Sequence, residues 1–114
     1  MEERTLYRID TILEHIEIVL NDTKGLSIEE LSNKDLLLRA TCFSIMQIGE
    51  IMVQLEKALS QEFPNLPWNG ARIMRNFIVH DYGEVSIRAI FDTINNDLPC
   101  LKIELLKIKE KYLK

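Results

Sequence analysis

Two arginines, an asparagine, a histidine and a tyrosine lie within eleven residues in the second half of the chain. They are Arg72, Arg75, Asn76, His80 and Tyr82. If this stretch is helical, the two guanidiniums, the amide and the imidazole share an arc of about 140° at 100° per residue. These residues are the strongest candidates for chemistry in the sequence.

This combination of groups suits phosphodiester cleavage. A histidine that titrates near neutral pH can take a proton from a ribose 2′-hydroxyl or give one to the leaving oxygen. An arginine offers two parallel hydrogen bonds to a phosphate and to the charge that develops in the transition state. This route needs no metal ion, because the adjacent 2′-hydroxyl is the nucleophile. On one helix Arg75 and His80 stand at opposite edges of the arc, and a second copy of the helix would bring such groups into one cleft.

A structural role for the same side chains is also open. Arg72 and Arg75 could each form an ion pair with a nearby acid, and Glu50 and Asp81 are candidates. His80 could then simply cap the end of its helix. Spacing alone does not choose between this interpretation and the chemical one.

Other recognisable chemistry is absent from the sequence. There is no glycine-rich phosphate loop, no HExxH or GxSxG motif, and no His/Cys cluster with metal-ligand spacing. The two cysteines, Cys42 and Cys100, form neither a CxxC pair nor a disulfide framework. His15 falls opposite the apolar stripe of the first predicted helix, so we expect it to be exposed. No metal site and no cofactor are expected.

Length and composition favour a single domain over residues 1–114. The 114 residues are 46% hydrophobic and 28% charged, close to globular averages. The longest apolar runs are only a few residues, as in Leu36–Leu38, whereas a membrane span needs roughly 18–20. The N-terminus also lacks the cationic-then-apolar order of a signal peptide. We therefore expect a cytoplasmic protein with no membrane partner.

The charge is unevenly distributed along the chain. A formal net charge of −4 argues against a nonspecific nucleic-acid coat. Residues 2–35 carry nine acids and four bases, whereas residues 102–114 carry five bases and two acids. The basic end could contact a phosphate backbone, or it could be the solvated face of a helix.

Apolar residues of the first segment recur at helical spacing. They form one stripe made of Leu6, Ile9, Leu13, Ile16 and Leu20. Ser27 and Glu30 have the spacing of a capping box, and Ser32 and Asp35 approximate one. The sequence therefore predicts a first helix followed by a short helical turn.

Three further helices follow, and no segment alternates as a strand would. The helix over about 34–61 is apolar over more than half its circumference, which requires a central place in the bundle or a subunit interface. Pro64 and Pro67 interrupt the chain before a shorter helix over about 68–81. Pro99 should kink or split the last helix, which begins near residue 86. We predict an all-α, up-and-down bundle of four main helices.

The stretch Trp68–Tyr82 contains R-x4-H-x-Y, in which the named residues are Arg75, His80 and Tyr82. The residues that flank this motif are Pro67-Trp68 before it, Ile48-Gly49-Glu50 in the preceding helix and Asp97-Leu98-Pro99 in the following one. With these flanks the chain resembles the HepT-like branch of the HEPN domain family. The resemblance covers about residues 35–101.

This resemblance implies a homodimeric, metal-independent endoribonuclease that acts as the toxin of a type VII-like toxin–antitoxin pair. In the family two R-x4-H motifs face each other across the dimer cleft. Carried over by position, Arg75 and His80 would be the catalytic pair, beside Asn76 and Arg72 as RNA- or phosphate-binding groups. The usual partner is a minimal nucleotidyltransferase that adenylylates the tyrosine of the motif, here Tyr82. The added bulk and negative charge would exclude RNA.

One position departs from the family pattern. Asp81 stands where a small residue, often glycine, is common; its carboxylate would favour the imidazolium form of His80 and repel RNA. A second function is therefore open: a non-catalytic module whose Arg72 and Arg75 face holds a nucleotide or substrate for the nucleotidyltransferase. A purely structural dimeric bundle is a third, although it leaves the Arg/His face unexplained.

Overall fold

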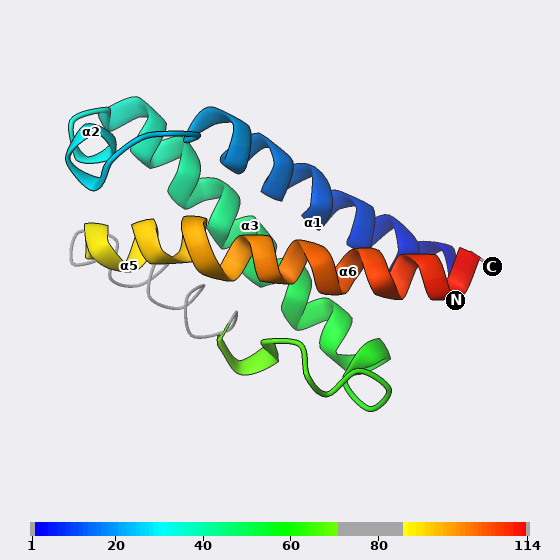
Figure 1. Cartoon of the computed structure of the whole chain (residues 1–114). Helices are drawn as coiled ribbons and strands as arrows, with labels where there is room; N and C mark the ends of the chain where they lie inside the picture. Colours follow the sequence, from blue (N-terminus) through cyan, green and yellow to red (C-terminus); the bar gives the residue numbers. More distant parts are fainter. Residues whose placement is uncertain (1, 71–85, 114) are drawn as a thin grey trace.

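The computed structural model describes residues 2–70 and 86–113, and within these ranges it contains helices and no strand. The all-α prediction is therefore confirmed (Figure 1). Residues 68–70 are helical, but most of the helix predicted over 68–81 lies outside the described residues. The elements are α1 (Glu3–Asp22), α2 (Ile28–Ser32), α3 (Asp35–Leu59), α5 (Ile87–Asp92), the π-helical turn η2 (Thr93–Asp97) and α6 (Leu98–Leu113).

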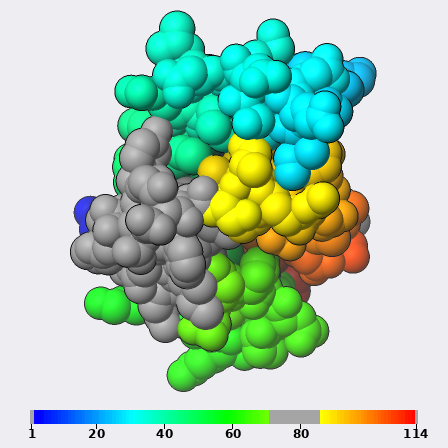
Figure 2. Space-filling view, turned by 90° about the vertical axis from the view of Figure 1, so that its left-hand side faces the viewer, coloured from blue at the N-terminus to red at the C-terminus, as the bar shows by residue number. Residues whose placement is uncertain are grey.

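Three long helices set the shape of the described part. α1 and α6 run antiparallel side by side, and both chain termini lie at the same end of the molecule (Figure 1). α3 crosses behind them and packs chiefly against α1. At the opposite end the short helix α2 contacts both α3 and α5, and Figure 2 shows α2 directly above α5.

A single apolar cluster joins these helices. Its buried members recur every three or four residues along each helix, as an amphipathic pattern requires. They are Ile9, Ile12, Ile16, Val19, Leu31, Cys42, Ile45, Ile48, Met52, Leu55, Leu59, Leu66, Trp68, Ile90, Ile94, Leu98, Leu101, Leu105 and Ile108. Along the last part of the chain the buried members form one face that continues through α5, η2 and α6.

The buried face of α1 is wider than the predicted stripe. Leu6, Leu13 and Leu20 of that stripe are only half-buried, whereas Ile12 and Val19 are completely or almost completely buried. The reason is that α1 packs against α3 on one side and α6 on another. Periodicity locates the middle of an apolar face, but the neighbouring helices decide its edges.

The connection from α1 to α3 confirms one predicted cap and corrects another. Ser27 Oγ accepts a hydrogen bond from the Glu30 amide at 3.1 Å, and Glu30 Oε1 accepts one from the Ser27 amide at 3.0 Å. These bonds hold the pKa of Glu30 below its ordinary value. The Ser32–Asp35 cap is wrong: Ser32 ends α2, and α3 begins without a side-chain cap.

α3 packs against α1 and α2 in the described part of the fold, and its predicted central or interface placement stays a prediction. Eight of its residues are buried, spread along its whole length from Thr41 to Leu59. By length and composition alone it is also the one helix of the described ranges that could cross a bilayer. The core helix of a globular protein passes the same test, and α3 packs against α1 and α2.

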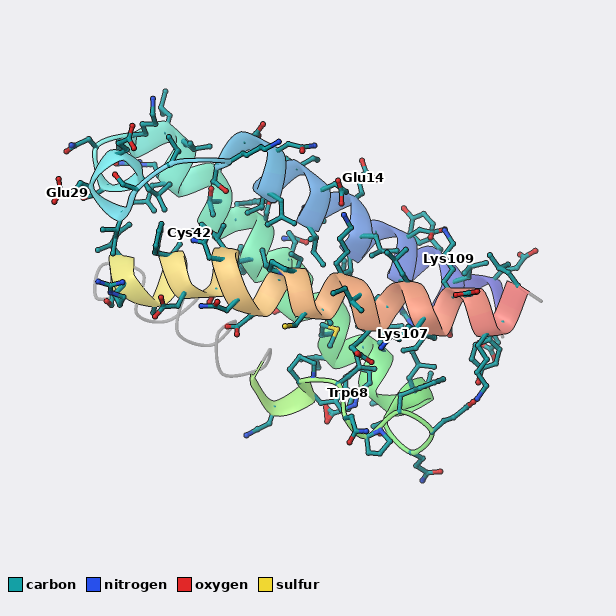
Figure 3. All side chains as sticks on the ribbon, in the orientation of Figure 1. Glu14, Glu29, Cys42, Trp68, Lys107 and Lys109 are labelled. Atoms are coloured by element: carbon teal, nitrogen blue, oxygen red, sulfur yellow. The ribbon has the colours of Figure 1, made fainter. Side chains whose placement is uncertain are left out.

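The lysines of α6 are held by acids, most of them on other elements. Lys109, which Figure 3 labels on α6, has its Nζ 2.6 Å from Asp10 Oδ1 of α1. Lys102 pairs with Glu17, so both lysines bind α6 to α1. Lys111 pairs with Glu62 in the turn after α3, and Lys107 pairs with Glu104 within α6. The basic end predicted from the sequence is therefore largely neutralised inside the molecule.

We predict that Leu105→Ala lowers the free energy of unfolding by about 3 kcal/mol, because Leu105 is completely buried and the change leaves a cavity. The adjacent Leu106 is 45% exposed, so Leu106→Ala should cost less than about 1 kcal/mol. Urea unfolding of the two variants measures both values. Equal losses would show that Leu105 is not a core residue.

Candidate active site

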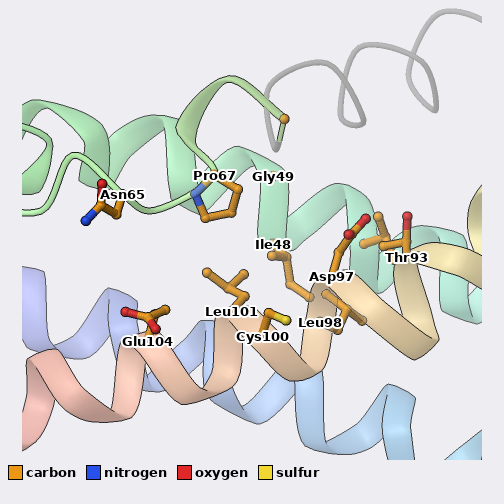
Figure 4. A pocket seen from close by; sticks show the side chains of 12 residues that line it. Ile48, Gly49, Asn65, Pro67, Thr93, Asp97, Leu98, Cys100, Leu101 and Glu104 are labelled. Atoms are coloured by element: carbon orange, nitrogen blue, oxygen red, sulfur yellow. The ribbon is translucent and has the colours of Figure 1, made fainter.

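The described residues form a pocket of about 360 Å³ between α3, the segment after it, and the last helices (Figure 4). Most of its wall is apolar. The lining residues are Ile45, Ile48, Gly49, Asn65, Pro67, Gly70, Thr93, Asp97, Leu98, Cys100, Leu101 and Glu104. Its volume falls in the range of small-molecule sites, about 300–1,000 Å³.

All three pieces of sequence that flank the R-x4-H motif reach this pocket. Ile48 and Gly49 come from α3, Pro67 precedes residues 68–70, and Asp97 and Leu98 come from the junction of η2 and α6. These pieces are far apart along the chain, so only the tertiary fold brings them together. The pocket is therefore the place in the described structure where the family-like features meet.

A π-helical turn carries Asp97 to the pocket. Pro99 has no amide hydrogen and its ring disfavours a regular α-helical turn before it. The chain responds with the wider turn η2, in which the Leu98 amide donates to the Thr93 carbonyl five residues earlier. Figure 1 shows α5 and α6 continuing along nearly one line across this turn. The disturbance predicted at Pro99 thus takes the form of a π turn, a feature frequent at functional sites.

The chain that leads into the motif is firmly anchored. Trp68 is buried, and its indole Nε1 donates to the Phe63 carbonyl at 2.9 Å. Leu66 is buried beside it in the core cluster. On the far side of the motif, Ser86 Oγ accepts from the Arg88 amide at 3.1 Å and caps α5. The described chain is thus held by a buried indole before the 71–85 segment and begins again with a helix cap after it.

The candidate catalytic and binding residues themselves lie outside the described residues. This applies to Arg72, Arg75, Asn76, His80 and Tyr82, which all fall within 71–85. Their assignments stay predictions from the sequence. The structure describes the pocket, the hydrogen-bonded residues before the 71–85 segment, and the helix cap at Ser86 after it.

The other histidine is not an exposed surface residue, contrary to expectation. His15 is half-buried, and its Nδ1 lies 3.4 Å from Ser44 Oγ. α3 packs on this side of α1, so the position opposite the predicted stripe is partly covered. His15 therefore belongs to the α1–α3 contact.

A cluster at the end of α6 holds the turn that follows α3. The Tyr112 hydroxyl donates to Glu62 Oε2, and Lys111 Nζ lies 3.0 Å from Glu62 Oε1. Phe63 packs edge to face against Tyr112, with ring centroids 6.2 Å apart. The bond from Tyr112 is the main reason why the pKa of Glu62 is lowered, and the same bond raises the pKa of Tyr112. Through Phe63, this cluster also supports the carbonyl that anchors Trp68.

The His, Cys, Asp and Glu side chains of residues 2–70 and 86–113 do not gather into a metal site. No group of three or more His, Cys, Asp or Glu side chains in those ranges could hold a metal ion. Cys42 is buried, which raises the pKa of its thiol, and Cys100 is exposed at the pocket. The described site consists of apolar walls with carboxylate, amide and hydroxyl groups at its ends.

Comparison with known proteins gives a consistent family match. The model of the family described as "Ribonuclease HepT-like" matches residues 12–108. The chain is 30% identical to "Putative RNase TTE0752" of Caldanaerobacter subterraneus, over 90% of this chain and 92% of that protein. It is 26% identical to "Probable ribonuclease HepT" of Thermococcus cleftensis, over 90% and 93% of the two chains. No solved structure matches it.

We predict that Tyr112→Phe raises the pKa of Glu62 toward its ordinary value, because the change removes the hydroxyl donor. In the wild type, the lowered pKa of Glu62 stabilises the folded state at pH values above the ordinary carboxyl pKa, and this stabilisation is lost as the pH falls. The contribution from the raised pKa of Tyr112 is present below the ordinary tyrosine pKa and lost as pH rises. An NMR titration of the Glu62 carboxyl carbon measures the change. An unaltered Glu62 titration would contradict the contact.

Proposed function

The chain belongs to the HepT-like ribonuclease family, and from this premise we propose that it is a metal-independent endoribonuclease toxin that a nucleotidyltransferase partner silences. The observation that carries the proposal is the family match across residues 12–108, together with an intact R-x4-H-x-Y motif. The gathering of the motif's flanking residues around one pocket supports it further.

Cleavage would proceed by transesterification within the RNA. One His80 takes the proton of the ribose 2′-hydroxyl, and the 2′-oxygen attacks the adjacent phosphorus. The bond to the 5′-oxygen breaks, and the leaving oxygen receives a proton from the His80 of a second copy. Arg75 holds the phosphate and stabilises the added negative charge by two hydrogen bonds. The products are a 2′,3′-cyclic phosphate and a 5′-hydroxyl.

This mechanism requires two copies of the chain. One helix would hold Arg75 and His80 at opposite edges of an arc, and a twofold axis would place the groups of both copies in one cleft. α3 carries exposed apolar side chains that a second subunit could cover. Leu36 is 83% exposed and Phe43 is 48% exposed. We therefore propose that the working unit is a homodimer in the cytoplasm, with no membrane partner.

RNA would be bound only by side chains near the R-x4-H motif. The lysines of α6 at positions 102, 107, 109 and 111 each pair with an acid, so they offer little free charge to a phosphate backbone. Arg72, Arg75 and Asn76 are the remaining candidates near the motif. A few phosphate contacts give a shallow dependence of affinity on salt.

The alternative function is a non-catalytic module that binds a nucleotide or substrate for a minimal nucleotidyltransferase. The specific observations in its favour are the net charge of −4, Asp81 within the motif, and the internal pairing of the lysines. Both functions use the Arg72 and Arg75 face. They differ in whether His80 is needed for a chemical step.

We predict that His80→Ala lowers RNA cleavage at least about 100-fold, because the change removes the general acid–base group. His15→Ala is the matched control: it removes the other histidine, which lies at the α1–α3 contact, and should leave cleavage within a fewfold of wild type. Cleavage of a labelled RNA measures both, with circular dichroism to confirm folding. A folded His80→Ala protein that still cuts at the wild-type rate would exclude the mechanism.

We predict that incubation with the cognate nucleotidyltransferase and ATP attaches AMP to Tyr82 and stops cleavage. The attached phosphate would repel RNA beside the histidine. Tyr82→Phe should escape modification, whereas Tyr7→Phe, which alters a tyrosine that is 71% exposed on α1, should be modified like wild type. Peptide mass spectrometry locates the adduct. Modification of Tyr82→Phe to the wild-type extent would exclude Tyr82 as the acceptor.

A further inference from the structure

The two ends of the pocket differ in their polar groups. Asp97 and Thr93 lie together at one end, and Asn65 and Glu104 lie at the other (Figure 4). Between them the wall is made by apolar side chains such as Leu101. A ligand that fills the pocket therefore meets apolar surface in its middle and polar groups at its edges.

The Asp97 end offers hydrogen-bond acceptors. An ionised carboxylate can only accept. The Thr93 hydroxyl donates to the Ala89 carbonyl at 2.9 Å, so its remaining capacity is also to accept. Among the lining residues that the structure describes there is no lysine, arginine or histidine. A phosphate would be repelled here, whereas a group with adjacent N–H donors would be bound.

The middle of the pocket suits a flat ring. Ile48 and Gly49 of α3 face Leu98 and Leu101 of α6 across it. Gly49 contributes no side chain to this wall. Sequence-specific recognition of RNA commonly places an unstacked base between such walls and reads its edge by hydrogen bonds.

The pocket also lies next to the start of the motif. Gly70 is one of its lining residues, and Arg72 and Arg75 follow two and five positions later in the sequence. Under the proposed function, a base held in the pocket would belong to the same RNA whose phosphate those arginines bind.

We propose that this pocket holds an unstacked guanine of the RNA, with the Asp97 carboxylate accepting from the N1–H and the 2-amino group of the base. Guanine presents two neighbouring donors that match the two carboxylate oxygens, whereas uracil presents one donor between two carbonyls. The position of this guanine relative to the cut rests on the proposed function. Binding of the base does not.

The first test measures binding by NMR with guanosine, inosine and uridine as probes. Guanosine should shift the amide signals of Gly49 and Thr93. Inosine lacks the 2-amino group and should bind about tenfold more weakly, the usual effect of losing one hydrogen bond to a charged acceptor. Uridine should bind more weakly still. Equal binding of guanosine and uridine would overturn the proposal.

Variants connect this preference to Asp97. Asp97→Asn replaces one acceptor oxygen by a donor in the same shape, so guanosine should lose its advantage over inosine. The matched control is Asp92→Asn, an exposed acid one helix turn and a half earlier that does not line the pocket; it should bind as wild type does. An unchanged preference in a folded Asp97→Asn protein would overturn the assignment of Asp97.

The second test maps cleavage sites by sequencing of the cut ends. Wild type and Asp92→Asn should show guanine enriched at one fixed position relative to the cut, and the cuts made by Asp97→Asn should lack this enrichment. Cutting by Asp97→Asn with the enrichment retained would overturn the proposal. A wild-type chain that binds guanosine but cuts no RNA would support the base pocket and instead refute the proposed endoribonuclease function.

Discussion

Burial of α3 is the constraint on which the rest of the described structure depends. The helix is apolar over more than half its circumference, so no single neighbour can cover it. α1 packs along one side, α2 covers its start, and the last helices approach the residues near Ile48. The pocket lies between α3 and these last helices. The candidate site is thus a consequence of how the core is closed.

Charge complements this packing. The acids of α1 and the lysines of α6 lie on adjacent helices and form ion pairs such as Asp10–Lys109. Exposed pairs of this kind contribute little to stability, commonly under about 1 kcal/mol. Their larger effect here is to neutralise cations that could otherwise contact RNA. Under the proposed function, a chain with a net charge of −4 would then bind RNA through a few arginines near the motif.

The approach to the motif shows how an exposed turn can be made rigid. Pro64 and Pro67 end one helix and prevent the next from starting early. Trp68 is then held by the Phe63 carbonyl, and Phe63 by the ring of Tyr112. The C-terminal end of the chain therefore supports the segment that leads into residues 71–85, although the two are far apart in sequence.

From local patterns alone, the sequence predicted the helical class, the Ser27–Glu30 cap and a disturbance near Pro99. These features follow from local spacing, capping chemistry and the missing proline amide, which do not depend on distant residues. It also contained the R-x4-H-x-Y motif, whose residues stay predictions because they lie outside the described ranges. Only the tertiary structure decided that His15 is half-buried, that the α6 lysines meet acids of α1, and that Gly49, Pro67 and Asp97 share one pocket. The physical reason is that burial, ion pairing and pocket formation depend on which surfaces meet across the fold, and one-dimensional periodicity does not specify those meetings.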